Sequence, residues 1–214
     1  MDARPIDVVF VRGAGEGAYE ADELLADSLA RHLGRGYAVT MPRLPADDDD
    51  SEPGHSGPLQ IIADAIAAAH PPVVLVGHSA GGYLLLEALT RRAPEEGDGD
   101  ADGPPRASVA LIALIAAPYP GADPDWTFDG FDLPTDIAER LPPGAPVLLY
   151  ASEDDDIVPF AHRDLYAAAL PGAITRTTTG GHQLGDDLSL VAADIRTHVP
   201  RRRPTHPSPG RVPS

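Results

Sequence analysis

Ser79 lies in a segment whose residue types suit a reactive hydroxyl. The segment reads Gly-His-Ser-Ala-Gly-Gly over residues 77–82, directly after a run of valine and leucine and before a helix-like stretch. This is the G-x-S-x-G pattern in a strand–turn–helix context, where the flanking glycines let the chain pass close to its neighbours. Such a turn lifts the Ser79 hydroxyl above a sheet and places the Ala80 N–H at a helix N-terminus, where it can donate to an oxyanion. A tight turn without chemistry is the alternative interpretation.

A base and an acid for this serine follow later in the chain. A serine hydroxyl is a weak nucleophile until a base removes its proton, and the base needs an acid that fixes its orientation. The segment Thr-Gly-Gly-His that ends at His182 supplies a base, because its two glycines let a loop swing the ring towards the sheet edge. The alternative for His182 is a buried structural histidine. Three carboxylates, Asp154, Asp155 and Asp156, follow the preceding strand-like run and compete for the role of acid.

The elements that must position these residues are short apolar runs alternating with segments of helical spacing. Strands are predicted over residues 6–11, 37–41, 73–76, 109–116, 146–151 and 174–178. Helices are predicted over residues 20–33, 59–69, 83–92, 161–170 and 188–198, the first with an apolar stripe of Leu24, Leu25, Leu29 and Leu33. Apolar strands separated by helices are typical of a parallel sheet covered on both faces. A length of 214 residues favours one domain with a sizeable core.

These motifs resemble the α/β-hydrolase superfamily, in particular its small single-domain serine hydrolases. The resemblance spans about residues 6–198, and its specific parts are the serine turn, the Asp-x-Ile-Val-Pro run and the Gly-Gly-His segment. It implies a three-layer α/β fold over residues 1–200, with a mostly parallel sheet of about six strands and a short cap segment at about 118–135. The antiparallel strands with which many such proteins begin are not expected, because the strand at 6–11 already precedes the loop that supplies an oxyanion donor.

The resemblance also implies roles for individual residues. Asp155 is selected as the acid because it stands four residues before Pro159, as the acid commonly does in such proteins. The second oxyanion donor is expected to be the backbone N–H of Ala14, with Gly13 as the alternative. Similar hydrolases often carry His-Gly where this chain has Arg12 and Gly13, and the substitution leaves the backbone donor in place.

The substrate implied by the resemblance is a small or short-acyl carboxylic ester or thioester, cleaved through an acyl-enzyme without metal or organic cofactor. A short cap roofs a shallow pocket better than a long tunnel, which favours small esters over triglycerides. Arg12, His78 and Trp126 are candidate pocket residues. Arg12 would favour an anionic substrate or pair with a site carboxylate, or form a salt bridge elsewhere. Phe128 and Phe131 are candidate pocket walls, although the aromatic residues could equally pack the cap onto the sheet. A binding protein that retains the triad is an alternative of a different class.

Composition excludes several other classes. The net charge is −17, from 16 basic and 33 acidic residues without lysine, and such a field repels nucleic acid and anionic lipid. The absence of cysteine excludes disulfides, thiolate metal sites and a cysteine nucleophile. The longest apolar run, Val109–Ala117, is too short to span a membrane. The chain begins with a strand-like segment and no leader, so a cytoplasmic location is expected. The oligomeric state stays open.

Three further segments imitate other functions. Residues 13–18 fit the G-x-G-x-x-G/A fingerprint, which keeps an NAD(P)-dependent oxidoreductase as an alternative. The following strand lacks the acidic residue that holds a ribose, although Arg43 could meet a 2′-phosphate. Residues 98–103 resemble the start of a calcium loop, but its twelfth position is Val109 instead of Glu. Residues 201–214, rich in Pro and Arg, are expected to be a disordered tail.

Overall fold

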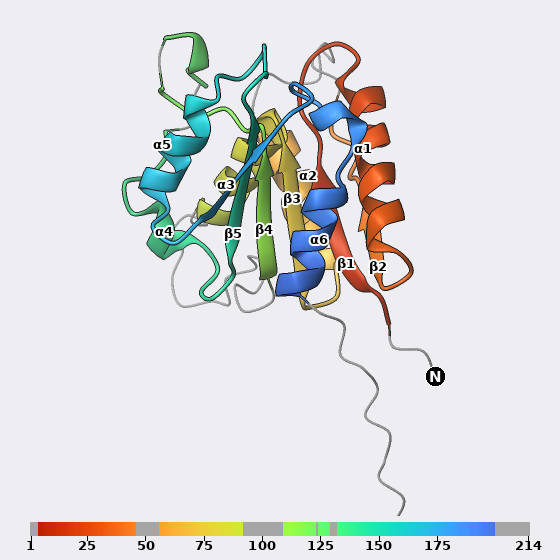
Figure 1. The fold of residues 1–214 in the computed structure, drawn as a ribbon. Helices are drawn as coiled ribbons and strands as arrows, with labels where there is room; N and C mark the ends of the chain where they lie inside the picture. The colour runs from red at the N-terminus through yellow and green to blue at the C-terminus, as the bar shows by residue number, and fades with distance from the viewer. Residues whose placement is uncertain (1–3, 46–55, 92–108, 123, 129–131, 200–214) are drawn as a thin grey trace, which may run out of the picture.

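One parallel sheet organises the fold. The computed structural model describes residues 4–45, 56–91, 109–122, 124–128 and 132–199. Its six strands are ordered β2-β1-β3-β4-β5-β6, and every neighbouring pair is parallel (Figure 1). The strands are β1 (Ile6–Val11), β2 (Tyr37–Thr40), β3 (Val73–His78), β4 (Val109–Ile115), β5 (Val147–Ser152) and β6 (Ile174–Thr178). The predicted α/β class and the expected parallel sheet of about six strands are confirmed.

Helices cover both faces of this sheet and make the fold three-layered. The first face is covered by α1 (Ala18–Leu33) and α6 (Ser189–His198). The second is covered by α2 (Ser56–Ala68), α3 (Ala80–Thr90), α4 (Ile137–Arg140) and α5 (Ala161–Ala169). Two single turns of 3-10 helix, η2 (Pro124–Trp126) and η3 (Leu184–Asp186), lie in the connections. The sequence analysis did not predict α4, η2 or η3, because a helix of a single turn shows no hydrophobic period.

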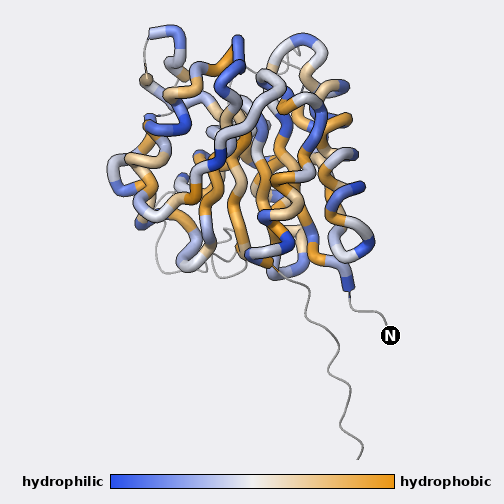
Figure 2. The backbone as a smooth tube through the Cα atoms, in the orientation of Figure 1, coloured by the Kyte–Doolittle hydropathy of each residue, from blue (hydrophilic) through white to orange (hydrophobic). Residues whose placement is uncertain are grey.

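Two apolar cores lie between the sheet and its helix layers. Successive side chains of a strand point to opposite faces. In β1, Val8 and Phe10 therefore face α1 and α6, whereas Val9 and Val11 face α2 and α3. Figure 2 shows the apolar strands at the centre and hydrophilic residues on the outer sides of the helices.

The buried stripe of α1 differs from the prediction at one position. Leu24 was expected to be buried, but it is 58% exposed. Asp22 is instead fully buried, because it lies three and seven residues before Leu25 and Leu29 on the inner face of the helix. An acidic side chain in a core needs hydrogen-bond partners, which the site below supplies.

Only Ser79 separates β3 from α3. The prediction ended the strand at residue 76 and began the helix at 83, whereas the structure continues β3 through His78 and begins α3 at Ala80. Gly81 and Gly82 have low helix propensity, so the sequence pattern alone places the helix start too late.

The sheet brings the predicted site residues to one edge. The carboxyl ends of parallel strands meet at the same edge, so the loops after β3, β5 and β6 share it (Figure 1). However, β4 and β5 lie between β3 and β6, a separation of about 14 Å at the usual strand spacing. The loop after β6 must therefore fold back across the edge to reach β3. The strand order also differs from the 3-2-1-4-5-6 order of the dinucleotide-binding fold.

Several expectations concern residues outside the described ranges. These are the calcium-like segment at 98–103, the tail at 201–214 and Phe131. Among the helices that the structure describes, none is both long and apolar enough to cross a bilayer.

Candidate active site

The serine turn holds Ser79 in a strained backbone conformation. Its φ is 51° and its ψ is −129°, values that side-chain-bearing residues rarely adopt. The Ser79 N–H donates to the Ile115 carbonyl at 2.8 Å, which fixes the turn against β4. No larger residue can replace Gly81 in this turn, because a Cβ there would overlap the backbone oxygens of Val11 and Arg12. Such strain, which costs about 1–3 kcal/mol, is common at functional sites.

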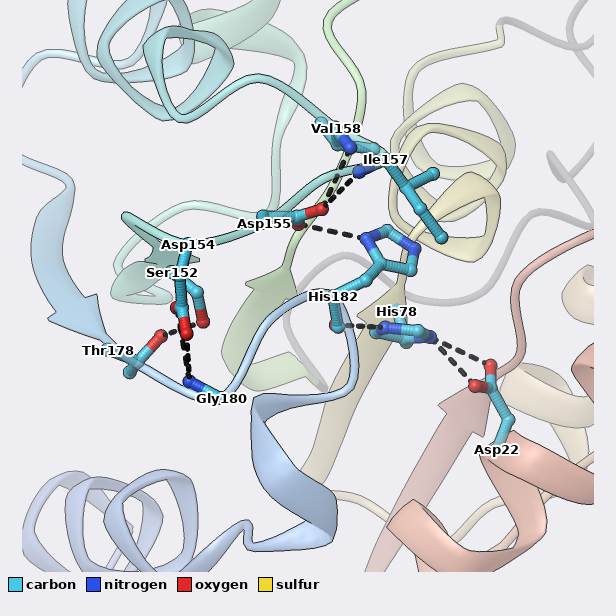
Figure 3. A network of polar contacts seen from close by, with 10 residues as sticks. All are labelled: Asp22, His78, Ser152, Asp154, Asp155, Ile157, Val158, Thr178, Gly180 and His182. Carbon is cyan, nitrogen blue, oxygen red and sulfur yellow. Dashed lines mark hydrogen bonds and ion pairs between the residues drawn. The ribbon is translucent and has the colours of Figure 1, made fainter.

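The loop after β6 turns back by means of glycines with positive φ. Gly180 and Gly181 have φ values of 98° and 65°, and a Cβ on Gly180 would lie 2.5 Å from the backbone nitrogen of Gly185. The Asp154 carboxylate accepts the Gly180 N–H at 3.1 Å (Figure 3). The backbone N–H groups of Gly181 and Gly180 accordingly lower the pKa of Asp154. Asp154 therefore fastens this loop instead of meeting the imidazole.

His182 and Asp155 lie against each other at the sheet edge. Nδ1 of His182 is 2.9 Å from Oδ2 of Asp155, and their side chains are only 8% and 1% exposed (Figure 3). Oδ1 of Asp155 accepts the N–H groups of Ile157 and Val158, each at 2.9 Å. Burial raises the pKa of Asp155, but the hydrogen bonds from His182, Val158 and Ile157 outweigh it and keep this pKa below its ordinary value. Asp156, the remaining competitor, is exposed.

A second acid–histidine pair lies beside the first, and the sequence analysis missed it. Nδ1 of His78 is 2.8 Å from Oδ1 and 3.0 Å from Oδ2 of Asp22 (Figure 3). Nε2 of His78 is 3.1 Å from the His182 carbonyl oxygen, and the two imidazole rings are 4.9 Å apart. The histidine loop thus reaches the serine turn. Asp22 could have been found from its place in the apolar stripe of α1, three residues before Leu25.

Of the backbone N–H groups around Ser79, one is bound to a side chain and two have no acceptor among the described residues. The Gly13 N–H donates to Oδ2 of Asp22 at 2.6 Å, so it is not free for an oxyanion. Within the described residues, the N–H groups of Ala14 and Ala80 meet no hydrogen-bond acceptor. A Cβ on Gly13 would lie 3.0 Å from Cβ and 3.5 Å from Oγ of Ser79, so the loop that carries Ala14 adjoins the serine.

Arg12 and His78 use their polar atoms within the protein. The Arg12 guanidinium donates to the carbonyls of Gly13, Leu44 and Pro45 at 2.7, 3.3 and 2.7 Å, and Arg12 is 5% exposed. It pairs with no carboxylate among the described residues. His78 is 1% exposed, with both ring nitrogens engaged. Nε of Arg12 is the exception, because it is buried without a hydrogen-bond partner among the described residues. The pocket roles of Arg12 and His78 stay predictions.

The segment expected to form a cap is attached through its aromatic residues. Trp126 meets the His162 ring edge-on at 5.1 Å, and Phe128 stacks on Tyr83 of α3 at 4.0 Å. His162, on α5, also accepts the Tyr119 N–H at 2.8 Å. Both aromatic side chains thus pack the segment onto helices of the second layer, while Trp126 keeps part of its surface exposed.

A serine and an acid–histidine pair at one sheet edge are the groups that nucleophilic acyl transfer uses. Within the described part of the chain, neither Nε2 of His182 nor the Ser79 hydroxyl forms a hydrogen bond. Catalytic hydrogen bonds are often long in ligand-free structures and tighten with substrate. The same ranges contain no group of three His, Asp or Glu side chains placed to hold a metal ion.

The sequence matches a known family over most of its length. The model of the Alpha/beta hydrolase family matches residues 8–210. A protein-glutamate methylesterase/protein-glutamine glutaminase 4 from Burkholderia thailandensis is 31% identical over 159 residues. That alignment covers 72% of this chain but 40% of the relative, so the chain spans less than half of the relative's length.

Solved structures share the fold at low sequence identity. A serine hydrolase involved in carbazole degradation, the CarC enzyme, has a TM-score of 0.66 at 15% identity, covering 92% of both chains. The esterase domain of a Rhodothermus marinus protein has a TM-score of 0.61 at 19% identity, covering 92% of this chain and 89% of that one. At these identities the similarity concerns the fold.

Proposed function

The chain belongs to the alpha/beta hydrolase family, and on that premise we propose that it is a serine hydrolase of small or short-acyl carboxylic esters or thioesters. The observation that carries the proposal is the 2.9 Å contact between His182 and Asp155 at the edge where the strained Ser79 lies. A buried carboxylate that holds Nδ1 of a histidine keeps Nε2 available as a base.

In the proposed reaction, Oγ of Ser79 attacks the acyl carbonyl carbon and its proton passes to Nε2 of His182. Asp155 orients the ring and stabilises its cation. The proton then goes to the leaving alcohol or thiol as its bond to the acyl carbon breaks. Water, deprotonated by the same nitrogen, attacks the acyl-enzyme, and the proton returns to Ser79 as the carboxylic acid leaves.

The oxyanion of each tetrahedral intermediate would be held by the N–H groups of Ala80 and Ala14. Both are free within the described residues, and the first stands at the N-terminus of α3, where the helix dipole favours negative charge. Loss of one such donor costs about 3 kcal/mol of transition-state stabilisation in known hydrolases.

A small acyl group is the proposed specificity. The cap, proposed to cover about residues 118–135, is short. The rings of Trp126 and Phe128 pack against His162 and Tyr83. This leaves few apolar side chains to line a long acyl tunnel. The Burkholderia thailandensis relative is named a protein-glutamate methylesterase, and this name supports ester chemistry without bearing on the size of the acyl group.

A fluorophosphonate probe tests the proposal, because it labels only an activated serine. The wild type is expected to be labelled and Ser79→Ala to stay unlabelled. Absence of labelling in the folded wild type would refute the activated serine. Labelling without turnover of any short ester would favour the alternative, a binding protein that retains the triad.

A series of p-nitrophenyl esters tests the specificity. We expect kcat/KM to be highest for acetate or propionate and to fall as the acyl chain lengthens. A clear preference for long acyl chains would overturn the small-pocket argument without touching the proposed nucleophile.

A further inference from the structure

Asp22 joins two parts of the site that the proposed reaction uses separately. Its carboxylate accepts the Gly13 N–H at 2.6 Å, which fixes the loop that carries Ala14. The same carboxylate lies 2.8 Å from Nδ1 of His78, inside the serine turn. Both side chains are 1% exposed, so the contacts form away from water, where hydrogen bonds to a charged group are strongest.

His78 carries the connection on to the histidine loop. Nε2 of His78 faces the His182 carbonyl oxygen at 3.1 Å (Figure 3). A carbonyl oxygen only accepts hydrogen bonds, so Nε2 carries a hydrogen. Nδ1 faces the Asp22 carboxylate, at 2.8 Å from Oδ1 and 3.0 Å from Oδ2. Both nitrogens of the ring are therefore engaged, one towards α1 and one towards the loop after β6.

This connection answers the geometric problem posed by the sheet. The loop after β6 must cross the edge past β5 and β4, and its glycines allow it to fold in many ways. His78 is the residue beside Ser79. Its hydrogen bond to the His182 carbonyl fixes the position of the His182 backbone at the end of the loop. The position of the imidazole relative to the hydroxyl thus depends on His78.

We propose that Asp22 and His78 form a positioning pair, which holds the oxyanion loop and the loop of the catalytic histidine in register with Ser79. The inference rests on the function proposed above. The pair acts through the backbone of Gly13 and His182, so neither residue touches the substrate. A misplacement of about 1 Å in a catalytic group can cost on the order of 100-fold in rate, which gives such a pair its value.

Paired substitutions test the proposal. His78→Phe keeps a flat ring but removes both hydrogen bonds, whereas His78→Gln keeps an amide N–H that can reach the His182 carbonyl. Asp22→Ala removes the acceptor, whereas Asp22→Asn keeps an oxygen for the Gly13 N–H and an N–H for Nδ1 of a neutral His78. Tyr150→Phe is the matched control, because it removes another buried hydrogen bond, to Asp194 at 3.0 Å, on the α6 face.

Steady-state kinetics on p-nitrophenyl acetate give the first readout. For His78→Phe and Asp22→Ala we expect kcat to fall about 30- to 100-fold with KM changed by less than about threefold, since an orientation effect acts on the chemical step. His78→Gln and Asp22→Asn are expected to recover about tenfold of that loss. Equal kcat values for His78→Phe and Tyr150→Phe would overturn the proposal, as would an Asp22→Asn as slow as Asp22→Ala. If His78→Phe does not fold, His78→Gln and the Asp22 variants carry the comparison.

Amide hydrogen exchange gives a second readout that does not need activity. In His78→Phe, peptides spanning residues 11–17 and 179–185 should exchange at least about tenfold faster, because both loops lose their common anchor. In Tyr150→Phe the same peptides should exchange as in the wild type. Unchanged exchange in His78→Phe would overturn the positioning role. A wild type that is neither labelled nor active would refute the proposed function, while the exchange data would still decide whether the pair holds both loops.

Discussion

Oδ2 of Asp155 lies 2.9 Å from Nδ1 of His182, whereas its neighbour Asp154 holds the Gly180 N–H. Adjacent carboxylates thus serve the same loop in different ways.

We expect Asp155→Asn to lower kcat about 10³- to 10⁴-fold, because the amide favours the wrong histidine tautomer. The exposed Asp156→Asn is the matched control and should stay within about twofold of the wild type. Initial rates on a short p-nitrophenyl ester measure both, and an Asp155→Asn within tenfold of the wild type would contradict the assignment.

The strain at Ser79 predicts a trade between stability and reactivity. Ser79 has a φ of 51°, where a Cβ is unfavourable. Ser79→Gly and Ser79→Ala should both be inactive, but the glycine variant should be more stable by about 1 kcal/mol, because only glycine adopts this conformation freely. Urea unfolding of the two variants measures the difference. A more stable alanine variant would show that the turn is not strained.

The contact between Gly82 and Ala117 predicts a compensating pair of substitutions. A Cβ on Gly82 would lie 2.5 Å from Cβ of Ala117, with its next contacts at 3.6 Å. Gly82→Ala alone should therefore lower the free energy of unfolding by about 1–3 kcal/mol. Adding Ala117→Gly removes the clashing atom and should return at least about half of that loss. A double-mutant cycle by chemical unfolding decides, and simple additivity would mean that the helix shifts instead.

The hydrogen bonds to Asp155 predict a pH dependence of stability. They hold the pKa of Asp155 in the folded protein below its ordinary value, despite the opposing effect of burial. A carboxyl whose folded pKa is lowered stabilises the fold above its unfolded pKa of about 3.9, and this stabilisation is lost as the pH falls through the folded pKa. The difference in unfolding free energy between wild type and Asp155→Asn should therefore shrink as the pH falls from about 5 through the folded pKa. A difference that is constant over this range would contradict the prediction.

Much of the fold could be predicted because its strands are apolar throughout. β1 and β6 have the predicted bounds, and β4 ends one residue earlier than expected. The start of α3 was placed three residues late, since the close approach of Gly81 to Val11 is a tertiary contact that local propensity does not contain. Leu24 shows the same limit, because the apolar pattern does not tell it apart from its neighbour Leu25, and the inner face of α1 is formed by Asp22, Leu25 and Leu29 instead.

The candidate site divides along similar lines. Ser79 and His182 follow strand ends and have motif glycines beside them, so motif and spacing suggest them. Asp155 was chosen among three adjacent carboxylates through the resemblance to the α/β-hydrolases. The Asp22–His78 pair joins residues 56 positions apart and has no motif. The one sequence signal for this pair is an acidic residue on the apolar stripe of α1. This signal indicates that Asp22 is buried, but it does not identify His78 as its partner. Partners in a core depend on strand order, and here β1 and β3 are adjacent because the chain places β2 outside them.

The two outermost strands of the described sheet bear on how the molecule behaves in concentrated solution. β2 and β6 have only four and five residues, and the exposed positions of β6 include Thr175 and Thr177. Arg176 on the same strand is drawn back onto α6 by Asp194, at 2.9 and 3.0 Å. Short border strands are poor templates for the addition of a foreign strand, and the exposed threonines of β6 add to this effect. We therefore expect the two short border strands to offer another chain little backbone on which to polymerise, although the interior between them is strongly apolar.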